Sequence, residues 1–427
     1  MTPVHAPALS ETSAALSLLF VVLIPCAAAG LALINAGLGR FRNASHSMLS
    51  ALCVIAVAAA VYFAIGAAWQ GSVGQPAFAV HVAGQDWNWI GAGRFFLRGL
   101  ELGGWSSLAT LFGLMSVGIA AIIPLGGGAD RWRLGASCAS TVLLAGWTYP
   151  LFAHWAWGGG WLAQQGFIDS GGAGVIQVVG GLTALSITWI LGPRRGKFNP
   201  DGMPSALPGH NAVYVLLGCF LAWLGWLGLD GAGAILFTGV EASRVVLIAV
   251  NTTLAAGLGA LAVAAITRAR FGKTDASLCA NGWVAGLVAV SAGCAVVRPA
   301  AAVIIGLVAG ALVVYSVEWL ELHLAVDDPG GSVSVHAVAG LWGLLAAGLL
   351  AAVAPGDAPG VLLAQLTGIA TLLGCILPLT YGLNWLLNRV MPQRVAVEGE
   401  RQGLDLYELG AGAYPDFMTH NEDFWQR

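Results

Sequence analysis

Long apolar runs constrain the fold of this chain more than any other feature. Eleven of them fill most of its 427 residues, and each is long enough to cross a bilayer, which takes about 20 apolar residues. Only 9% of the residues are charged, whereas a soluble domain carries about 25%. We therefore expect an all-α integral membrane protein with 11 transmembrane helices, because backbone polar groups in lipid must be paired within helices. The runs lie near 12–39, 47–69, 101–125, 134–157, 172–192, 211–229, 243–267, 278–296, 299–322, 333–354 and 360–388.

The basic residues support this count. When successive loops alternate between the two sides of the membrane, one side receives fourteen of the eighteen Lys and Arg residues. These are Arg40, Arg42, Arg131, Arg133, Arg194, Arg195, Lys197, Arg268, Arg270, Lys273, Arg389, Arg394, Arg401 and Arg427. Cytoplasmic loops carry such an excess. We expect a multi-pass protein of the plasma (inner) membrane, with the N-terminus outside and the C-terminus cytoplasmic.

One pattern occurs twice in the chain. DSGGAGVIQVVGGL at 169–182 and DPGGSVSVHAVAGL at 328–341 align without a gap. Each copy opens the last helix of a five-helix unit, so the two units must have opposite orientations in the membrane. We expect an inverted 5+5 repeat with halves at about 12–192 and 211–354, followed by an eleventh helix. The transmembrane domain is expected to cover 1–390, and a cytoplasmic tail 391–427.

Each copy places one large polar side chain in its apolar run, eight residues after the Asp: Gln177 and His336. A polar side chain at that depth is costly and usually faces a cavity or a partner. A plain interhelical hydrogen bond is one interpretation of such a histidine. The repeat favours a second, in which Gln177 and His336 face each other across a pore. Only His336 can take up a proton near neutral pH, so a relay between two imidazoles is not available.

Three further candidates lie toward the outer side. Asp169 begins a helix, where a carboxylate caps the first turn and can also attract a cation. Trp157 precedes three glycines that lead to Asp169; Trp rings attract cations but also anchor helices at the membrane interface. Trp226 ends another run at the outer mouth. The outer segment 70–100, rich in Trp and Phe, is expected to lie on the membrane surface.

Several function classes are excluded by what the sequence offers. No nucleophile–base set or phosphate-binding loop is visible, so we do not expect an enzyme. No ligand spacing indicates a metal site, and nothing indicates a cofactor. The net charge of −3 gives no reason to expect a nucleic-acid partner.

Six segments spread over nearly the whole chain carry distinctive motifs. They are ALINAGLGRFRNASHSML (32–49), ADRWRLGA (129–136), AHWAWGGGWLAQQGFIDSGG (153–172), GWLGLDGAGA (225–234), VDDPGGSVSVHAVAGLWG (326–343) and GLDLYELGAGAY (403–414). Together they resemble the ammonium transporter/Rh (Amt/MEP/Rh) family. The resemblance implies eleven helices, a homotrimer and one ammonium or ammonia path per subunit. It implies that Trp157 helps to bind ammonium, that Asp169 lies below that site, and that His336 is the second of two pore histidines.

The chain departs from the family's pattern at its pore, which marks it as a divergent member. The departures are Gln177 for the first pore histidine, Leu229 and Ser116 for two gate phenylalanines, Gly233 for a serine that contacts the outer cation, Asp230 for an asparagine, and Leu409 and Ala411 for a tail histidine and glutamate, whereas Phe112 keeps an earlier phenylalanine. Losing two aromatic rings predicts a wider outer mouth and weaker cation–π binding.

The expected function is therefore an ammonium channel or transporter with an altered pore, which moves ammonium/ammonia or a small amine. One alternative is a sensor or binding homologue that does not conduct. Another is a channel for a methylated amine or another small neutral molecule. The expected partners are the substrate, membrane lipid and two further subunits, with a cytoplasmic regulatory protein at the C-terminal tail as an additional candidate.

Overall fold

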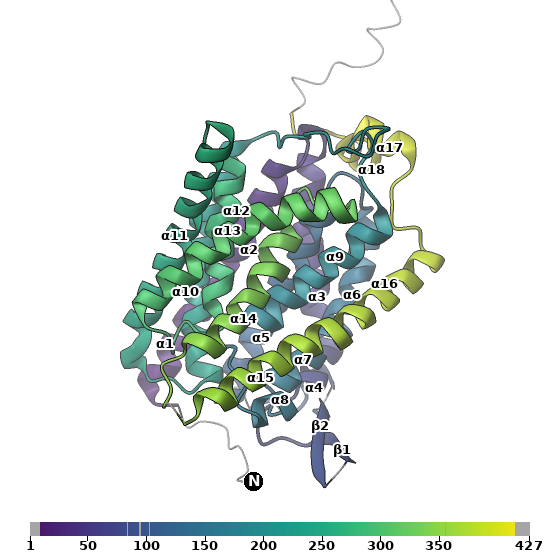
Figure 1. The fold of residues 1–427 in the computed structure, drawn as a ribbon. Helices are drawn as coiled ribbons and strands as arrows, with labels where there is room; N and C mark the ends of the chain where they lie inside the picture. Colours follow the sequence, from purple (N-terminus) through teal and green to yellow (C-terminus); the bar gives the residue numbers. More distant parts are fainter. Residues whose placement is uncertain (1–8, 83, 94, 102, 355, 415–427) are drawn as a thin grey trace, which may run out of the picture.

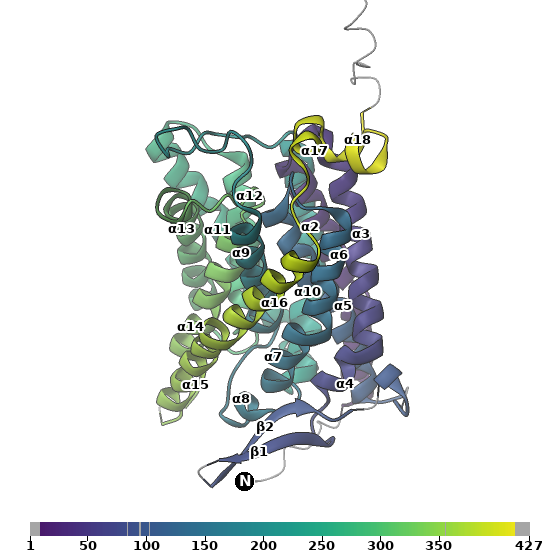
Figure 2. The same cartoon turned by 90° about the vertical axis from the view of Figure 1, so that its right-hand side faces the viewer.

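The computed structural model describes residues 9–414 except 83, 94, 102 and 355. Arg94 and Arg427, which entered the count of basic residues, and the outer ends of both expected domains lie outside the described residues. The described chain forms a bundle of long helices (Figures 1 and 2). Its α-helices are α1 (Glu11–Val21), α2 (Ile24–Leu38), α3 (Ala44–Val61), α4 (Ala67–Gln70), α5 (Trp105–Gly128), α6 (Leu134–Leu143), α7 (Tyr149–Ala156), α8 (Trp161–Gln164), α9 (Val179–Leu191), α10 (Ala212–Phe237), α11 (Val245–Phe271), α12 (Ala276–Ser291), α13 (Pro299–Leu324), α14 (Ala339–Leu350), α15 (Ala358–Thr371), α16 (Leu377–Val390), α17 (Val397–Gln402) and α18 (Leu404–Leu409).

Shorter helical segments connect or interrupt these helices. The 3₁₀ segments are η1 (Phe41–Asn43), η3 (Phe95–Leu97) and η6 (Ala242–Arg244). The π-helical segments are η2 (Tyr62–Gly66), η4 (Leu144–Thr148), η5 (Ala173–Val178), η7 (Val333–Val338) and η8 (Leu372–Ile376). A π-helical turn inside an α-helix often marks a functional site, and η5 and η7 contain Gln177 and His336.

Within the described residues, helices cover most of each of the eleven predicted runs. Nine helices within the described residues are long and apolar enough to cross a membrane: Glu11–Leu38, Phe41–Gln70, Trp105–Gly128, Ala173–Leu191, Ala212–Phe237, Ala242–Phe271, Pro299–Leu324, Val333–Leu350 and Ala358–Val390. The other two runs form α6–η4–α7 and the shorter α12, of 16 residues. The helical membrane fold is confirmed, while the count of 11 spans and the 5+5 repeat stay predictions.

Packing differs between the interior and the surface of the bundle. Between α2 and α10, a Cβ on Gly225 would collide with the backbone of Ala27, so glycine permits the close approach of these helices. On the surface, large apolar side chains such as Val213, Phe220 and Val246 stay exposed. Such a surface suits a lipid environment and not water.

One end of the bundle carries a β-hairpin that the all-α prediction missed. Strands β1 (Ala77–Val82) and β2 (Gln85–Gly91) pair antiparallel, at the bottom of Figures 1 and 2. Val, Phe and Trp favour strands. The two strands also pair each other's backbone N–H and C=O groups, which a surface helix would pair within itself. The hairpin is tied to α7, because Trp155 Nε1 donates to the Trp89 carbonyl over 2.8 Å. We call this end of the bundle the hairpin end.

The opposite end carries the C-terminal helices, and we call it the tail end. There, the Asp405 carboxylate accepts hydrogen bonds from the amides of Ser45 (3.2 Å) and His46 (2.7 Å). Glu408 Oε2 accepts from the amide of Leu134 at 2.9 Å and lies 2.8 Å from His46 Nε2. Helix α18 therefore bridges the starts of α3 and α6. The charge pattern assigned the loops before these two helices to one side.

A buried ionic cluster joins several tail-end loops. Arg194 contacts Asp327 through Nε (2.9 Å) and Nη2 (3.0 Å), and Asp130 through Nη1 (2.9 Å). Burial would raise the pKa of Asp327, but its hydrogen bonds with Arg194 and the positive charges nearby hold that pKa below its usual range. The Asp327 carboxylate is therefore charged in the folded protein.

Arg131 belongs to the same cluster. The sequence placed it among the basic residues of one membrane side, but its side chain is 0% exposed. It donates to the carbonyls of Gly192 (2.8 Å), Ala129 (3.0 Å) and Asp327 (2.7 Å). Burial lowers the pKa of Arg131 to about 10, against the opposing charge of Asp327. Its guanidinium therefore ties three chain segments together.

Candidate functional site

The two copies of the repeated pattern adopt the same local structure. Gly172 (φ 85°) and Gly331 (φ 68°) both take the left-handed conformation, which favours glycine because it has no Cβ. Each glycine is followed by a π-helical segment, η5 or η7, and then by α9 or α14. The shared sequence thus encodes a shared turn.

Each copy also caps its own helix with the Asp that opens it. Asp169 Oδ2 accepts hydrogen bonds from the amides of Gly174 (3.0 Å) and Val175 (2.9 Å). Asp328 Oδ2 accepts from the amide of Val333 over 2.6 Å. The capping role predicted for Asp169 is therefore confirmed, and Asp328 caps its helix in the same way, since these amides lack partners inside the helix.

Gln177 and His336 lie in direct contact, which fits both interpretations that the sequence left open, the interhelical hydrogen bond and the pore pair. His336 Nδ1 lies 2.8 Å from Gln177 Oε1. An amide oxygen only accepts, so Nδ1 must carry the proton and Nε2 remains an acceptor. Gln177 is fully buried, and its Nε2 donor has no partner among the described residues. The pair therefore leaves the amide NH₂ group of Gln177 as a donor and one imidazole nitrogen as an acceptor for a small polar molecule.

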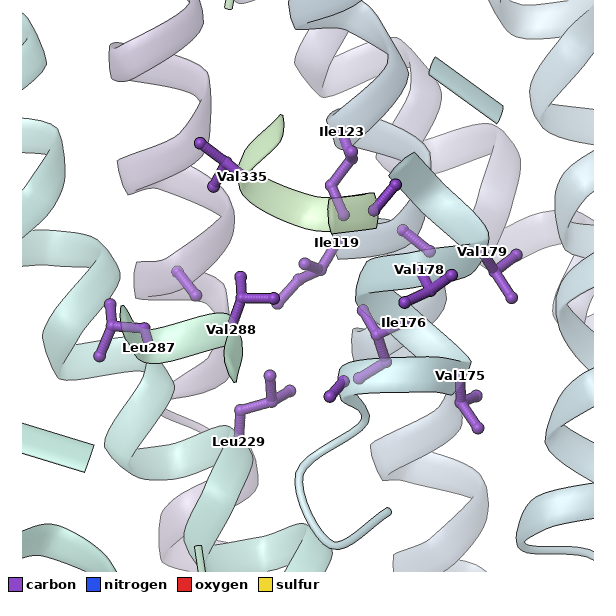
Figure 3. Packing of buried hydrophobic residues seen from close by; sticks show 14 of the residues in the cluster. Ile119, Ile123, Val175, Ile176, Val178, Val179, Leu229, Leu287, Val288 and Val335 are labelled. Atoms are coloured by element: carbon purple, nitrogen blue, oxygen red, sulfur yellow. The ribbon is translucent and has the colours of Figure 1, made fainter. Parts of the chain in front are cut away.

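The elements that carry or adjoin this pair contribute apolar side chains to one buried cluster. Leu229 on α10, Ile176 on η5 and Val288 on α12 are fully buried in one hydrophobic cluster, and their side chains gather between these elements in Figure 3. Ile119 and Val335 also lie in this cluster (Figure 3). An amide and an imidazole in such surroundings have few competing polar partners, which strengthens their interaction with each other or with a guest.

Trp157 forms an aromatic cluster toward the hairpin end, together with Phe112 and Phe237. The rings of Trp157 and Phe237 stack at 4.3 Å with an interplanar angle of 5°. Phe112 meets Trp157 edge-on at 5.7 Å and Phe237 at 5.2 Å. The predicted wider mouth is therefore not seen on this face of Trp157, because Phe237 covers it.

Phe237 was not among the site residues predicted from the sequence. It ends α10, one residue after Leu236, whose carbonyl accepts from Trp105 Nε1 over 2.8 Å. An aromatic residue closing an apolar run at the same membrane side as Trp157 was an available signal. Aromatic residues at run ends are so often interface anchors that this signal alone does not single out Phe237.

Ser116 and Trp226 have protein partners. Ser116 Oγ lies 2.7 Å from Tyr149 Oη, so the position that the resemblance assigns to a gate phenylalanine holds a buried hydroxyl pair. Trp226 is fully buried, and its Nε1 donates to Ser291 Oγ over 3.1 Å. Of the predicted site residues, the structure directly joins Gln177 with His336 and Phe112 with Trp157. It also joins Trp157 with Asp169, through a 2.8 Å hydrogen bond from Nε1 to the Asp169 carbonyl.

A multi-pass helical bundle with a polar pair buried between two matching helix openings is the architecture of a membrane transport protein. Similarity to known protein families and structures defines that class further. The model of the Ammonium Transporter Family matches residues 15–414, and the chain belongs to this family.

Curated relatives agree with this assignment. The chain is 36% identical to "Ammonium transporter Amt2" of Archaeoglobus fulgidus over 415 residues, which cover 91% of this chain and 85% of that protein. It is 30% identical to the "Ammonium transporter" of Bacillus subtilis over 405 residues, covering 91% of this chain and 95% of the relative. These relatives are transporters and not enzymes.

Solved structures share the fold. A protein described as "Sensor Amt Protein" matches with a TM-score of 0.85 and 28% identity, covering 93% of this chain and 98% of that one. Mep2 of Candida albicans matches with a TM-score of 0.80 over 96% of this chain and 91% of its own; at 24% identity this likeness concerns the fold alone.

Proposed function

We propose that this protein moves ammonium/ammonia or a small amine across the membrane along a path past Trp157, Asp169, Gln177 and His336. The single observation that carries the proposal is the 2.8 Å contact between Gln177 Oε1 and His336 Nδ1. It supports a polar passage through a largely apolar interior, because a buried polar pair supplies hydrogen bonds that a dehydrated amine can exchange there.

The proposed path differs from one lined by two histidines. Gln177 cannot take up a proton, so His336 is the one titratable group of the pair. In our proposal, Trp157 and Asp169 recruit the cation, while Phe112, Ser116, Trp226 and Leu229 shape the approach to the pair. The free Nε2 donor of Gln177 and the Nε2 acceptor of His336 then hold the passing molecule.

Currents measured on solid-supported membranes with the purified protein test this proposal. Ammonium and methylammonium pulses should each be applied to the wild type and to His336→Ala. We expect a current in the wild type and its loss in His336→Ala. Gln177→His, which restores two imidazoles, is expected to conduct. A full current in His336→Ala would contradict the proposed path.

A second candidate function is a sensor or binding homologue that does not conduct. Two observations favour it: the likeness to a sensor Amt protein over 93% of the chain, and the Phe237 ring that stacks on Trp157. Calorimetric binding of ammonium without any current would select this function. A current with methylammonium and none with ammonium would select transport of a methylated amine instead.

Assembly and orientation complete the proposal. We propose a homotrimer of subunits with 11 spans in an inverted 5+5 arrangement, in the plasma (inner) membrane, with the N-terminus outside and the tail end in the cytoplasm. The exposed apolar surface of α10 and α11 supports contact with lipid or neighbouring subunits. The docked helices α17 and α18 offer a surface to a cytoplasmic regulatory protein.

A further inference from the structure

Two buried carboxylates toward the hairpin end each keep one oxygen atom without a partner. Asp230, on α10, is 0% exposed, and Asp169 is 3% exposed. Asp230 Oδ2 accepts a hydrogen bond from Thr252 Oγ1 over 2.7 Å, and Asp169 Oδ2 caps η5. The Oδ1 atoms of both have no hydrogen-bond partner among the described residues. A buried polar atom in this state is costly, so each Oδ1 is placed to take a proton or to contact a cation.

The two carboxylates belong to elements in direct contact. The amide of Gly171 donates to the Ser291 carbonyl over 2.8 Å, which holds the segment after Asp169 against the end of α12. A Cβ on Gly171 would collide with Asp230 Oδ1, so this oxygen points at that segment. Ser170 Oγ is also fully buried without a partner in the described chain. Three unpartnered oxygen atoms thus come from adjoining residues.

The surroundings supply no compensating charge. Among the described residues, neither Asp169 nor Asp230 forms an ion pair. The titratable groups that face Asp230 are Asp169, from the segment before η5, and Cys294, after α12, whose Sγ lies 3.9 Å from the Asp230 carbonyl. Thr252 and Ser291 contribute neutral hydroxyls. Burial disfavours the ionised form of each carboxylate, and the charge of one disfavours ionisation of the other.

We propose that Asp230 and Asp169 form one site for a single exchangeable positive charge, either a proton or a small monovalent cation. The site adjoins the recruitment end of the proposed path, because Trp157 Nε1 donates to the Asp169 carbonyl; only this link to substrate rests on the proposed function. The asparagine that the family resemblance implies at position 230 would need no such charge. The site is therefore a property of this chain.

The cation form of the proposal is tested by thermal unfolding of the purified protein. Sodium, potassium or ammonium chloride should replace choline chloride at constant ionic strength. A bound cation raises the unfolding midpoint with the logarithm of its concentration. We expect this rise in the wild type and in Asp357→Asn, an exposed control with the same chemical change, and its loss in Asp230→Asn.

The proton form is tested by infrared difference spectroscopy between mildly acidic and mildly alkaline buffers. If the charge is a proton, a carboxylic-acid C=O band should appear on acidification in the wild type and in Asp357→Asn, and be missing from Asp230→Asn. If Asp230→Asn matches the wild type in both experiments, Asp230 holds no exchangeable charge and the proposal is overturned.

A second variant keeps the test decisive if Asp230→Asn does not fold. Thr252→Val keeps the shape of the side chain but removes the hydrogen bond to Asp230 Oδ2, which stabilises the ionised carboxylate. We expect Thr252→Val to bind the charge more tightly, and unchanged binding would contradict the site. Both readouts are equilibrium measurements, so a protein without any current would refute the proposed transport and leave this inference standing.

Discussion

Removing the Phe237 ring should strengthen the binding of ammonium and methylammonium. In the structure this ring lies parallel to Trp157 at 4.3 Å, on a face of the indole that a cation would otherwise use. A cation that enters on this face must first displace Phe237. Phe237→Ala removes that competition and leaves Trp157, with its hydrogen bond to the Asp169 carbonyl, in place.

The size of the effect follows from the ring contact that is lost. An aromatic pair contributes about 0.5–1.5 kcal/mol beyond its buried area. Because about 1.4 kcal/mol corresponds to a tenfold change in affinity, Phe237→Ala should tighten binding by about twofold to about twelvefold. The edge-on contact with Phe112 at 5.2 Å adds to the cost of displacing Phe237, so we expect a value in the upper part of this range.

Isothermal titration calorimetry with both cations measures this affinity whether or not the protein conducts. Phe78→Ala is the control, since this residue lies on β1 with 61% of its surface exposed. Thermal unfolding of Phe237→Ala should be recorded beside it, to separate binding from loss of stability. Weaker binding in a stable Phe237→Ala protein would refute the reasoning, because Phe237 would then be a wall of the binding site and not its cover.

Three further predictions concern the tail end. Arg194→Met leaves Asp327 buried without its partner and should lower the free energy of unfolding by about 3–5 kcal/mol, whereas Arg270→Met, in an exposed pair, should leave the chemical denaturation curve unchanged. The pKa of Asp327 is lowered in the folded state, so the ionised carboxylate stabilises the protein above its unfolded pKa of about 3.9 and this stabilisation is lost as pH falls through the folded pKa. Asp327→Asn should remove this acid dependence of stability. An unchanged pH profile of stability in Asp327→Asn would contradict the prediction. Glu408→Gln weakens the contacts with His46 and the Leu134 amide, so amide hydrogen exchange in α18 should become faster. The exposed control Glu398→Gln should leave that exchange unchanged. Equal exchange rates in the two variants would mean that other contacts hold the tail.

The burial of Arg131 and Arg194 could not be predicted from the sequence. Their position in a loop between apolar runs predicted their side of the membrane, because the distribution of basic residues reflects topology. It could not predict burial, since Arg131 reaches carbonyls of residues 61 and 196 positions away. Such contacts depend on which loops the bundle brings together.

The same limit applies at the candidate site. Gln177 and His336 could be paired in advance, because a repeated sequence makes their environments equivalent. Phe237 could not be placed over Trp157, since these residues share no repeat and their stacking depends on how α10 and α7 pack. The hairpin at residues 77–91 was missed for a related reason: its strands are stabilised by each other and by Trp155.

The sequence by itself determined the membrane-spanning helical class, the places of the eleven apolar runs, and the pairing of an amide with an imidazole. These features follow from hydropathy and from an internal repeat. Hydropathy is a property of each segment, and a repeat is found by comparing the chain with itself. Only the tertiary structure decided which face of Trp157 is covered, which carboxylates lack a partner, and which arginines are buried. Those outcomes depend on contacts between distant residues, and their geometry is set by packing that no single segment encodes.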